Sequence, residues 1–281
     1  MIFLKPPSRE ILRVTQLDAS RRTYISERIE SLLDEISDRY RVKFTRSSFY
    51  KGNYARQCVV FEHEDGTFKV IDSNDSNRLV NGKIIPFLEN PKCQFVLKCQ
   101  YNKTCRINKV RPFFYFEKKN SRNFYKSISS LRDIEKKSNK IYWKGNLYLG
   151  RYDILTKIKD LLNEDWQERV TASNFYQELS SHKLAVSLPG WGKSCHREFE
   201  CFAVGTAVIA PVFENTYHMP LVPNYHYLAI ESGPIDEKIR ERVEKTTFDE
   251  IAEVRKNAMK YYDDFIRFEP SVKMIEHLLE L

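Results

Sequence analysis

The chain has 281 residues, of which 42% are apolar and 30% are charged. This length is sufficient for two mid-sized domains, and the composition excludes a disordered chain and a fibrous repeat. No run approaches the ~20 consecutive apolar residues that span a bilayer, and the N-terminus lacks the pattern of a secretory signal. The formal net charge of +8 suits a protein that binds phosphate groups, and it also suits weak contact with nucleic acid.

The elements expected in the first half are one helix and several short strands. Four residues at helical spacing predict a helix over Ser26–Arg39. Alternating and β-branched residues predict strands over 41–49, 57–63, 67–72 and 93–100. This half is therefore expected to contain a sheet.

The second half has the pattern of strands that alternate with helices. An apolar segment at 140–146 precedes a helical segment at 154–162. A strand at Lys183–Leu188, a loop and a helix at His196–Val204 lead through Gly205 to a strand at 206–211. A short strand over Tyr225–Glu231 and a helical tail follow. This order predicts βαβ units and hence an α/β fold, with Gly205 at the end of a helix.

The loop after the strand at Lys183–Leu188 is the main candidate for a binding site. In α/β sheets, ligands bind outside the carboxyl ends of strands and next to helix N-termini, where backbone N–H groups attract anions. The loop comprises Pro189, Gly190, Trp191, Gly192, Lys193 and Ser194. Lys193 and Arg197 are cations at a helix start, which is unfavourable unless an anion lies between them. A diphosphate is the candidate ligand, and a plain helix cap satisfied by Glu198 and Glu200 is the alternative.

The same loop has a superficial similarity to the phosphate loop of nucleotide hydrolases and kinases, G-x-x-x-x-G-K-[ST]. The pattern fails at its first position, because Ser187 stands five residues before Gly192. A nucleotide-dependent phosphotransferase is therefore the second interpretation of this loop.

Three stretches of the second half carry a family resemblance through their order and spacing. Residues 140–146, with Arg151 downstream, have an aromatic strand, a basic-Gly turn and an arginine. Residues 183–211 have a strand, a small-residue loop and a helix start, with eight residues from Arg197 to Gly205. Residues 221–227 contain a Pro-x-x-His-Tyr pattern, with Pro223 and His226, just before the last strand. Together they resemble the protein O-glucosyltransferases and capsule-associated xylosyltransferases, a family with the GT-B fold.

The chain departs from the family pattern at several points. Ser194 and Arg197 are one residue further apart than in the usual Ser-x-Arg, and Asn146 stands where a serine is common. The chain is also shorter than typical members and lacks their secretory leader. A compact cytoplasmic version, such as large DNA viruses of algae encode, would suit that difference.

The resemblance implies a GT-B fold in which two Rossmann-like domains face each other across a cleft. Residues 1–139 would form the acceptor-side domain, residues 140–255 the donor-side domain, and residues 256–281 the returning C-terminal helices. Arg151 and Arg197 would hold the diphosphate of a UDP-sugar, while the Gly190–Ser194 loop and the Lys144–Asn146 turn would line the nucleotide. The alternative for Arg151 is a surface residue near Asp153. Arginines would replace a divalent cation, so no metal or other cofactor is expected.

Inverting sugar transfer needs a carboxylate that takes the proton of the acceptor hydroxyl, and the resemblance implies that this base lies in the first half of the chain. The resemblance favours Asp75, directly after the strand that ends near Ile71, and Asp72 is second. Ordinary turn chemistry is an equally good explanation of these residues. His196 and His226 are expected near the donor site by location alone.

Other candidate chemistry is weaker. Three of the six cysteines, Cys93, Cys99 and Cys105, recur every six residues, which matches no zinc site, and reduced thiols are the simpler interpretation. The resemblance implies an inverting, metal-independent glycosyltransferase that moves xylose or glucose from a UDP-sugar to a glycan or glycoprotein. The expected protein is cytoplasmic, without a membrane span or a nucleic-acid partner. A basic nucleic-acid-binding protein is the alternative from another class.

Overall fold

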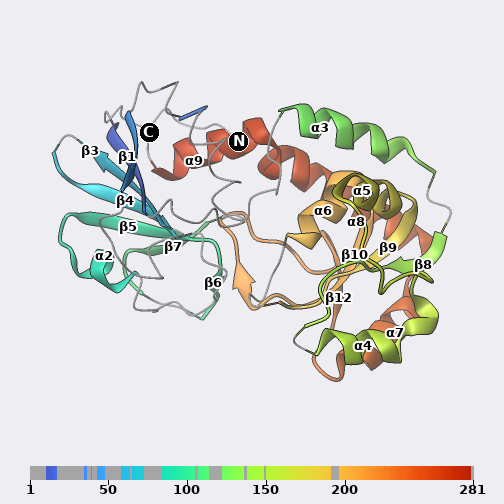
Figure 1. Ribbon diagram of the computed structural model, residues 1–281. Coiled ribbons are helices and arrows are strands. Elements are labelled where there is room, and N and C mark those ends of the chain that lie inside the picture. Colours follow the sequence, from blue (N-terminus) through green and yellow to red (C-terminus); the bar gives the residue numbers. More distant parts are fainter. Residues whose placement is uncertain are drawn as a thin grey trace. The chain divides into compact units, whose positions relative to one another are not determined.

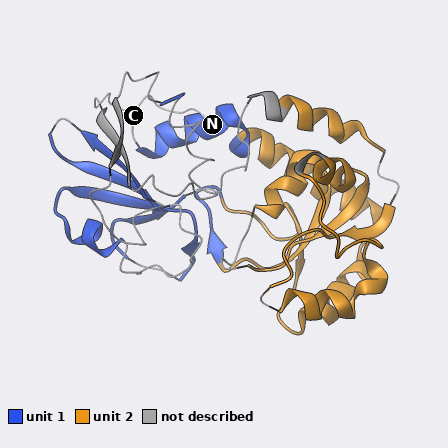
Figure 2. Cartoon of the chain, in the orientation of Figure 1, with its two compact units in different colours: residues 1–122, 215–219, 265–281 blue, residues 123–214, 220–264 orange. Residues whose placement is uncertain are grey.

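Figure 1 shows the computed structural model of the chain. The residues that the structure describes are 11–17, 35–36, 39, 43–47, 58–63, 65–72, 84–104, 107–113, 122–135, 138–148, 150–190 and 196–279. The chain divides into two compact units, which Figure 2 colours separately. Unit 1 contains residues 1–122, 215–219 and 265–281, and unit 2 contains residues 123–214 and 220–264.

Unit 1 is built on a six-stranded sheet with the order β2-β1-β3-β4-β5-β7. The strands are β1 (Ile11–Leu17), β2 (Lys43–Ser47), β3 (Cys58–His63), β4 (Phe68–Asp72), β5 (Cys93–Lys98) and β7 (Val110–Pro112). The sheet is mixed: β3 runs antiparallel to both of its neighbours, whereas β4, β5 and β7 are mutually parallel. The strands predicted at 41–49, 57–63, 67–72 and 93–100 are confirmed as β2, β3, β4 and β5.

The antiparallel pair β3–β4 exists because a tight turn joins the two strands. Gly66 has φ +75°, which an L-residue adopts at a cost, and Asp65 accepts a hydrogen bond from the backbone N–H of Thr67 at 2.9 Å. Against this sheet, helix α2 (Ile85–Glu89) contributes Phe87 to a buried cluster with Val70 and Val96. A small sheet of β6 (Tyr101–Asn102) and β11 (Asn215–Thr216) and the helix α9 (Phe268–Leu279) complete the regular elements described for unit 1.

Unit 2 is built on a four-stranded parallel sheet with the order β12-β10-β9-β8. The strands are β8 (Ser138–Tyr142), β9 (His182–Val186), β10 (Ala207–Pro211) and β12 (Leu228–Ile230). The helical elements are α3 (Arg122–Ser129), η2 (Ser130–Asp133), α4 (Arg151–Lys157), η3 (Lys159–Leu161), α5 (Ala172–Ser180), α6 (Arg197–Val204), α7 (Ile235–Lys245), α8 (Phe248–Tyr261) and η4 (Tyr262–Ile266). The predicted alternation of strands and helices in this half is confirmed.

The crossover from β9 through α6 to β10 positions the start of α6 at the carboxyl edge of the sheet. Gly205 ends α6 in the left-handed region with φ +69°, as the sequence predicts for a helix C-terminal glycine. A Cβ at this position would lie 2.6 Å from Sδ of Met259 in α8, so a side chain here would also displace that of Met259. The parallel pairing of β9 with β10 follows from this connection.

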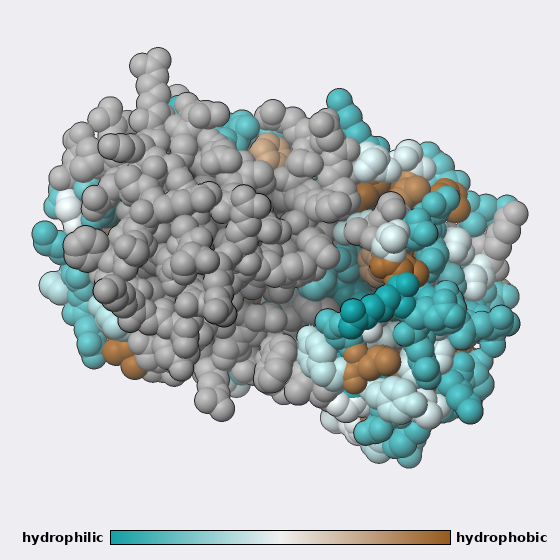
Figure 3. Space-filling view, viewed as in Figure 1, coloured by the Kyte–Doolittle hydropathy of each residue, from teal (hydrophilic) through white to brown (hydrophobic). Residues whose placement is uncertain are grey.

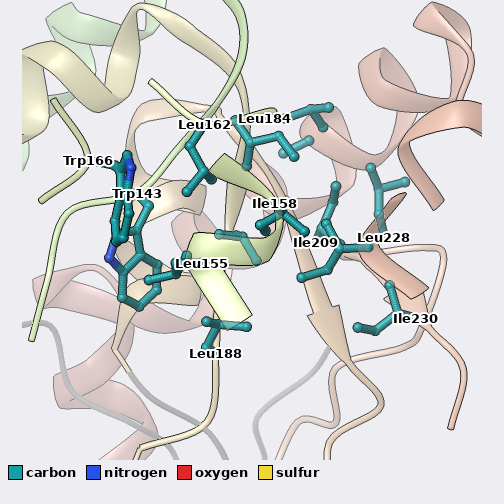
Figure 4. Packing of buried hydrophobic residues seen from close by; sticks show 14 of the residues in the cluster. Trp143, Leu155, Ile158, Leu162, Trp166, Leu184, Leu188, Ile209, Leu228 and Ile230 are labelled. Atoms are coloured by element: carbon teal, nitrogen blue, oxygen red, sulfur yellow. The ribbon is translucent and has the colours of Figure 1, made fainter. Parts of the chain in front are cut away.

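The core of unit 2 is a continuous apolar cluster from the strands and the helices that cover them. Figure 4 shows Trp143 and Trp166 at one end of this cluster and Leu228 and Ile230 at the other. A strand that is buried on both faces consists mostly of consecutive apolar residues. This is why β9 and β10 could be predicted from the sequence. On the face in Figure 3, the coloured surface of unit 2 is mostly hydrophilic, with separate small apolar patches.

Some predictions from the sequence can be compared with only part of the structure, because the residues concerned are not all described. The helix predicted over Ser26–Arg39 lies mostly outside them, and Glu35, Ile36 and Arg39 are helical where they are described. Within the described ranges, no helix has the length and apolarity needed to cross a membrane. The division at 139/140 and the roles assigned to the two halves stay predictions.

Candidate anion-binding site

The candidate site lies at the carboxyl ends of β8 and β9, the two strands at one edge of the unit 2 sheet. The segment Trp143–Asn146 follows β8, the segment Ser187–Gly190 follows β9, and Arg197 begins α6. An isolated bridge between Ile141 and Leu162 extends the sheet by one more parallel contact beyond β8. Carboxyl ends of parallel strands next to helix N-termini are the usual place for ligands in α/β folds.

A chain of polar contacts fixes the turn after β8. The backbone N–H of Trp143 donates to Oδ1 of Asn163 at 2.9 Å, and Nδ2 of Asn163 donates to Oδ1 of Asp165 at 2.7 Å. The buried Lys144 donates from Nζ to both the carboxylate and the backbone carbonyl of Asp165. The hydrogen bond from Lys144 lowers the pKa of Asp165 below its ordinary value, and the bond from Asn163 adds to this shift. The charge of Lys144 is therefore already balanced within the protein.

Arg151 stands at the start of α4 and is only 7% exposed. Its guanidinium donates to three backbone carbonyls: Nη2 to Leu188 at 2.8 Å, Nε to Pro189 at 2.9 Å, and Nη1 to Asn146 at 3.3 Å. These bonds join the turn after β8 to the loop after β9. The side chain is therefore buried, and the alternative that it is a surface residue near Asp153 is wrong.

Arg197 reaches the same place from the start of α6. Its Nη2 donates to the backbone carbonyl of Lys144. Its guanidinium carbon lies 4.4 Å from the ring centroid of Trp143, and that of Arg151 lies 5.6 Å from the same ring. The ring of Phe175 in α5 is 5.9 Å from Arg197 on another side. The two arginines that the sequence singled out therefore converge on one tryptophan.

Two glycines make room for these guanidinium groups. A Cβ at position 145 would lie 2.7 Å from Nη2 of Arg197, and a Cβ at position 190 would lie 2.9 Å from Nη2 of Arg151. Hydrogen bonds to carbonyls hold both arginines, so neither guanidinium can move away without losing one. Gly145 and Gly190 thus leave room for arginine side chains, whereas the family resemblance implied that their segments line the nucleotide.

The charge at the site is not balanced by neighbouring carboxylates. Among the residues that the structure describes, no Asp or Glu lies within ion-pair distance of Arg151 or Arg197, which contrasts with Lys144. The two acidic residues of the first turn of α6 have other partners: Glu198 accepts from Oγ of Ser187 at 2.6 Å, and Glu200 lies 3.5 Å from Nε2 of His196. Arg151 is buried and Arg197 is partly buried. A cation that is removed from water without a counter-ion is costly, and this favours an anionic ligand.

The remaining predicted residues are placed as follows. Asn146 is exposed, whereas Pro189 and Gly190 are half-buried. Trp191, Gly192, Lys193 and Ser194 lie outside the described residues, and so does Asp75. His196 precedes α6, whereas His226 packs 5.0 Å from the ring of Tyr261 in α8.

Asp72, the second candidate for the base, is fully buried at the end of β4 in unit 1. Nζ of Lys98, at the end of β5, lies 3.0 Å from its Oδ2 and is itself fully buried. An enclosed carboxylate with an ammonium partner is poorly suited to receive a proton from an external hydroxyl.

The sequence interpretation did not identify Trp143, Asn163 and Asp165 as site residues. Trp143 carried a usable signal, because it stands in the aromatic strand that ends at the candidate turn. Asn163 and Asp165 carried none, because they come from a separate segment that the bridge at Leu162 brings beside β8.

A separate pocket of about 380 Å³ lies in unit 2 at the ends of β10 and β12. Its charged lining is largely paired: Lys238 lies 3.0 Å from Glu241, and Arg242 forms an ion pair with Glu250. The pocket therefore offers little unbalanced charge to a ligand.

The comparisons with known proteins bear on the fold. No family model matches the sequence, and the comparison with curated proteins finds no match. WaaG, a glycosyltransferase involved in lipopolysaccharide biosynthesis, is similar in structure with a TM-score of 0.51 and 9% identity, covering 96% of this chain and 99% of WaaG. The likeness confirms the predicted fold class, an α/β fold of the GT-B type.

Two further solved structures are more distant. A glycosyltransferase from Rickettsia africae ESF-5 has a TM-score of 0.46 and 10% identity over 94% of this chain and 83% of that chain. TarM has a TM-score of 0.45 and 14% identity over 78% of this chain, which spans 51% of the length of TarM.

Proposed function

We propose that the protein is an inverting glycosyltransferase that moves xylose or glucose from a UDP-sugar to a hydroxyl group of a glycan or glycoprotein. The observation that carries the proposal is the convergence of Arg151 and Arg197 on Trp143, without a carboxylate partner for either guanidinium among the described residues. Fixed guanidinium groups beside a helix N-terminus suit the two linked phosphates of a nucleotide-sugar. The GT-B type of fold, shared with WaaG, supports the same class of reaction by analogy.

In this mechanism the acceptor oxygen attacks the anomeric carbon of the sugar. The bond from that carbon to the β-phosphate oxygen breaks, and UDP leaves with the electron pair. Arg151 and Arg197 stabilise the charge that develops on the leaving diphosphate, and Arg151 also holds the loop after β9 through its bonds to backbone carbonyls. We propose that these guanidinium groups serve in place of a divalent cation, so that the reaction proceeds without metal.

The acceptor hydroxyl loses its proton to a carboxylate of unit 1. We assign this role to Asp75, on the strength of the resemblance to the xylosyltransferase family. The enclosure of Asp72 by Lys98 supports this choice between the two candidates. An aspartate in this role contributes roughly 10²–10⁴-fold to the rate.

The class of reaction is tested by incubating the protein with a panel of UDP-sugars in the presence of EDTA and measuring UDP release. We expect release from UDP-xylose or UDP-glucose, enhanced by glycan acceptors. Release that depends on added magnesium would contradict metal independence. Turnover of ATP with no response to UDP-sugars would favour the phosphotransferase.

Two variants separate donor binding from chemistry. Arg197→Ala is expected to abolish UDP binding, whereas Asp75→Asn is expected to retain UDP binding and to stop turnover. Arg240→Ala is the matched control, because Arg240 is an exposed arginine of the same unit that pairs with Asp160. Retained turnover in Asp75→Asn would move the base to Asp72 or elsewhere.

A further inference from the structure

Two hydrogen-bond donors at the candidate site have no acceptor among the residues that the structure describes. They are Nε1 of Trp143 and Nη1 of Arg197, and both atoms are enclosed. Trp143 is 0% exposed. A buried indole N–H usually finds a partner, and an unpaired buried donor costs the protein the desolvation of that group. Because the side chains that carry these two donors are in contact, one acceptor missing beside both is the simplest explanation.

The two side chains that carry these donors are in contact. The guanidinium carbon of Arg197 lies 4.4 Å from the ring of Trp143. Both side chains also lie beside Gly145: a Cβ there would be 3.5 Å from Cζ2 of Trp143 and 2.7 Å from Nη2 of Arg197, the nitrogen that donates to Lys144. Gly145 itself is exposed. The two side chains therefore lie next to a surface position where the backbone carries no side chain.

The missing acceptor is expected to carry negative charge. A guanidinium without a carboxylate partner favours an anion over a neutral carbonyl, and its hydrogen bonds to anions are the stronger kind. Arg151 is a second cation beside the ring of Trp143, and its positive charge also favours an anion at this position.

We propose that Nε1 of Trp143 and Nη1 of Arg197 together bind one non-bridging oxygen of a phosphate group. The proposal rests on the proposed function, in which that phosphate belongs to a UDP-sugar, and it assigns to Trp143 a direct contact with the donor. We call the position of this oxygen beside Trp143 and Arg197 the oxygen seat. Gly145 has no side chain that could block access to the oxygen seat.

The experiment follows the indole N–H of Trp143 by NMR in protein labelled with ¹⁵N at its three tryptophans, Trp143, Trp166 and Trp191. Trp143→Phe identifies the resonance by its absence. The labelled protein is titrated with inorganic pyrophosphate, UDP and uridine. We expect pyrophosphate and UDP to move the Trp143 resonance and uridine to leave it in place.

Measurements of the affinity of Trp143→Phe for anions test the oxygen seat independently of the NMR titration. Because a hydrogen bond to a charged group is lost, Trp143→Phe is expected to weaken the binding of both pyrophosphate and UDP by about tenfold or more. Trp166→Phe is the matched control, since it removes an indole N–H from the same apolar cluster and is expected to leave both affinities unchanged.

The outcomes distinguish this inference from the proposed function. Binding of UDP with an unmoved Trp143 resonance and an unchanged Trp143→Phe affinity would overturn the oxygen seat and leave the transferase proposal standing. Binding of pyrophosphate without UDP, with the resonance moved, would support the seat and contradict a UDP-sugar donor. A resonance that moves equally with uridine, or a protein that binds neither anion, would overturn the seat.

Discussion

At the scale of single residues, the site is organised by pairs of one glycine and one arginine. Arg197 lies against Gly145 and Arg151 lies against Gly190, and carbonyl oxygens hold each guanidinium in place. These glycines, whose segments are expected from the resemblance to line a nucleotide, therefore serve first to admit the arginine side chains that would bind it. A substitution at either glycine acts through its arginine.

Gly145→Ala tests this dependence. The new Cβ would lie within 2.7 Å of Nη2 of Arg197, a separation that real Cβ atoms do not show, so the guanidinium must move from the carbonyl of Lys144. We expect UDP affinity to fall by about tenfold, which corresponds to the loss of roughly one charged hydrogen bond. Isothermal titration calorimetry measures the change.

A double-mutant cycle provides the control for Gly145→Ala. If the alanine acts through Arg197, it is expected to cause no further loss of affinity when added to Arg197→Ala. Additive losses in the double variant would show that Gly145 contacts the ligand independently of the arginine, and the pairing of Gly145 with Arg197 would then not explain the effect.

Arg151→Lys separates a structural role from ligand binding. A lysine ammonium cannot reproduce the planar fork that donates to Leu188, Pro189 and Asn146. We expect the free energy of unfolding in urea to fall by about 1–3 kcal/mol, since buried carbonyls lose their donors. An unchanged stability with weakened UDP affinity would show instead that Arg151 acts on the ligand alone.

The sequence predicted these residues unevenly, for a physical reason. Gly190 and Arg197 lie in segments whose local pattern marks a glycine loop and a helix start, whereas Arg151 and Lys144 were expected only from the family resemblance. The partners that fix them, such as Asn163, become neighbours only through tertiary pairing of distant segments. Local patterns indicate where a site lies, whereas the contacts that hold it depend on the completed sheet.

At the scale of elements, the segment before β12 is held by a histidine that must be neutral. Nδ1 of His226 accepts the backbone N–H of Val222 at 2.9 Å, and the rings of Tyr225 and Tyr261 pack against it. Burial lowers the pKa of His226 below its ordinary value of 6.5. The folded state therefore favours the neutral ring over the protonated one.

The sign of the pH dependence follows from this shift. The stabilisation is fully present above the unfolded pKa of 6.5 and is lost as the pH falls through that value toward the lower folded pKa. We expect the Tm to decrease between about pH 7.5 and about pH 5.5. His226→Asn, which keeps an acceptor for Val222 but does not titrate, is expected to reduce the decrease.

The wild-type protein must be compared with His226→Asn because a second histidine, His218, also contributes to the pH dependence. Burial, with His277 nearby, also lowers the pKa of His218, so that part of the pH dependence of the wild-type protein comes from unit 1. Equal decreases in Tm for the wild-type protein and His226→Asn would assign the effect to groups other than His226.

The two sheets were predictable to different degrees. In unit 2, apolar runs separated by helices specify parallel strands, because short βαβ connections leave few alternatives. In unit 1, the short turn at Gly66 makes β3 and β4 antiparallel, while the longer connection to β5 makes the next pair parallel. Strand positions could be predicted there, but the mixed order of the sheet depends on pairing between distant segments.

At the scale of the whole molecule, the two units are interleaved along the chain. Residues 215–219 of unit 1 lie between two parts of unit 2, and residues 265–281 return to unit 1 after unit 2 is complete. Each unit nevertheless has its own sheet and its own apolar cluster.

This organisation allows the donor site to be assigned to one unit by hydrogen exchange. Every described residue of the anion-binding site belongs to unit 2, so UDP is expected to protect backbone amides of 143–146, 187–190 and the start of α6. With UDP at about 100 times its Kd, exchange through openings that release the ligand should slow by up to about 100-fold. Strands β3, β4 and β5 of unit 1 should change much less, and Arg197→Ala should abolish the protection in unit 2. Protection confined to unit 1 would contradict the site, because the guanidinium groups that are proposed to bind the diphosphate come from α4 and α6.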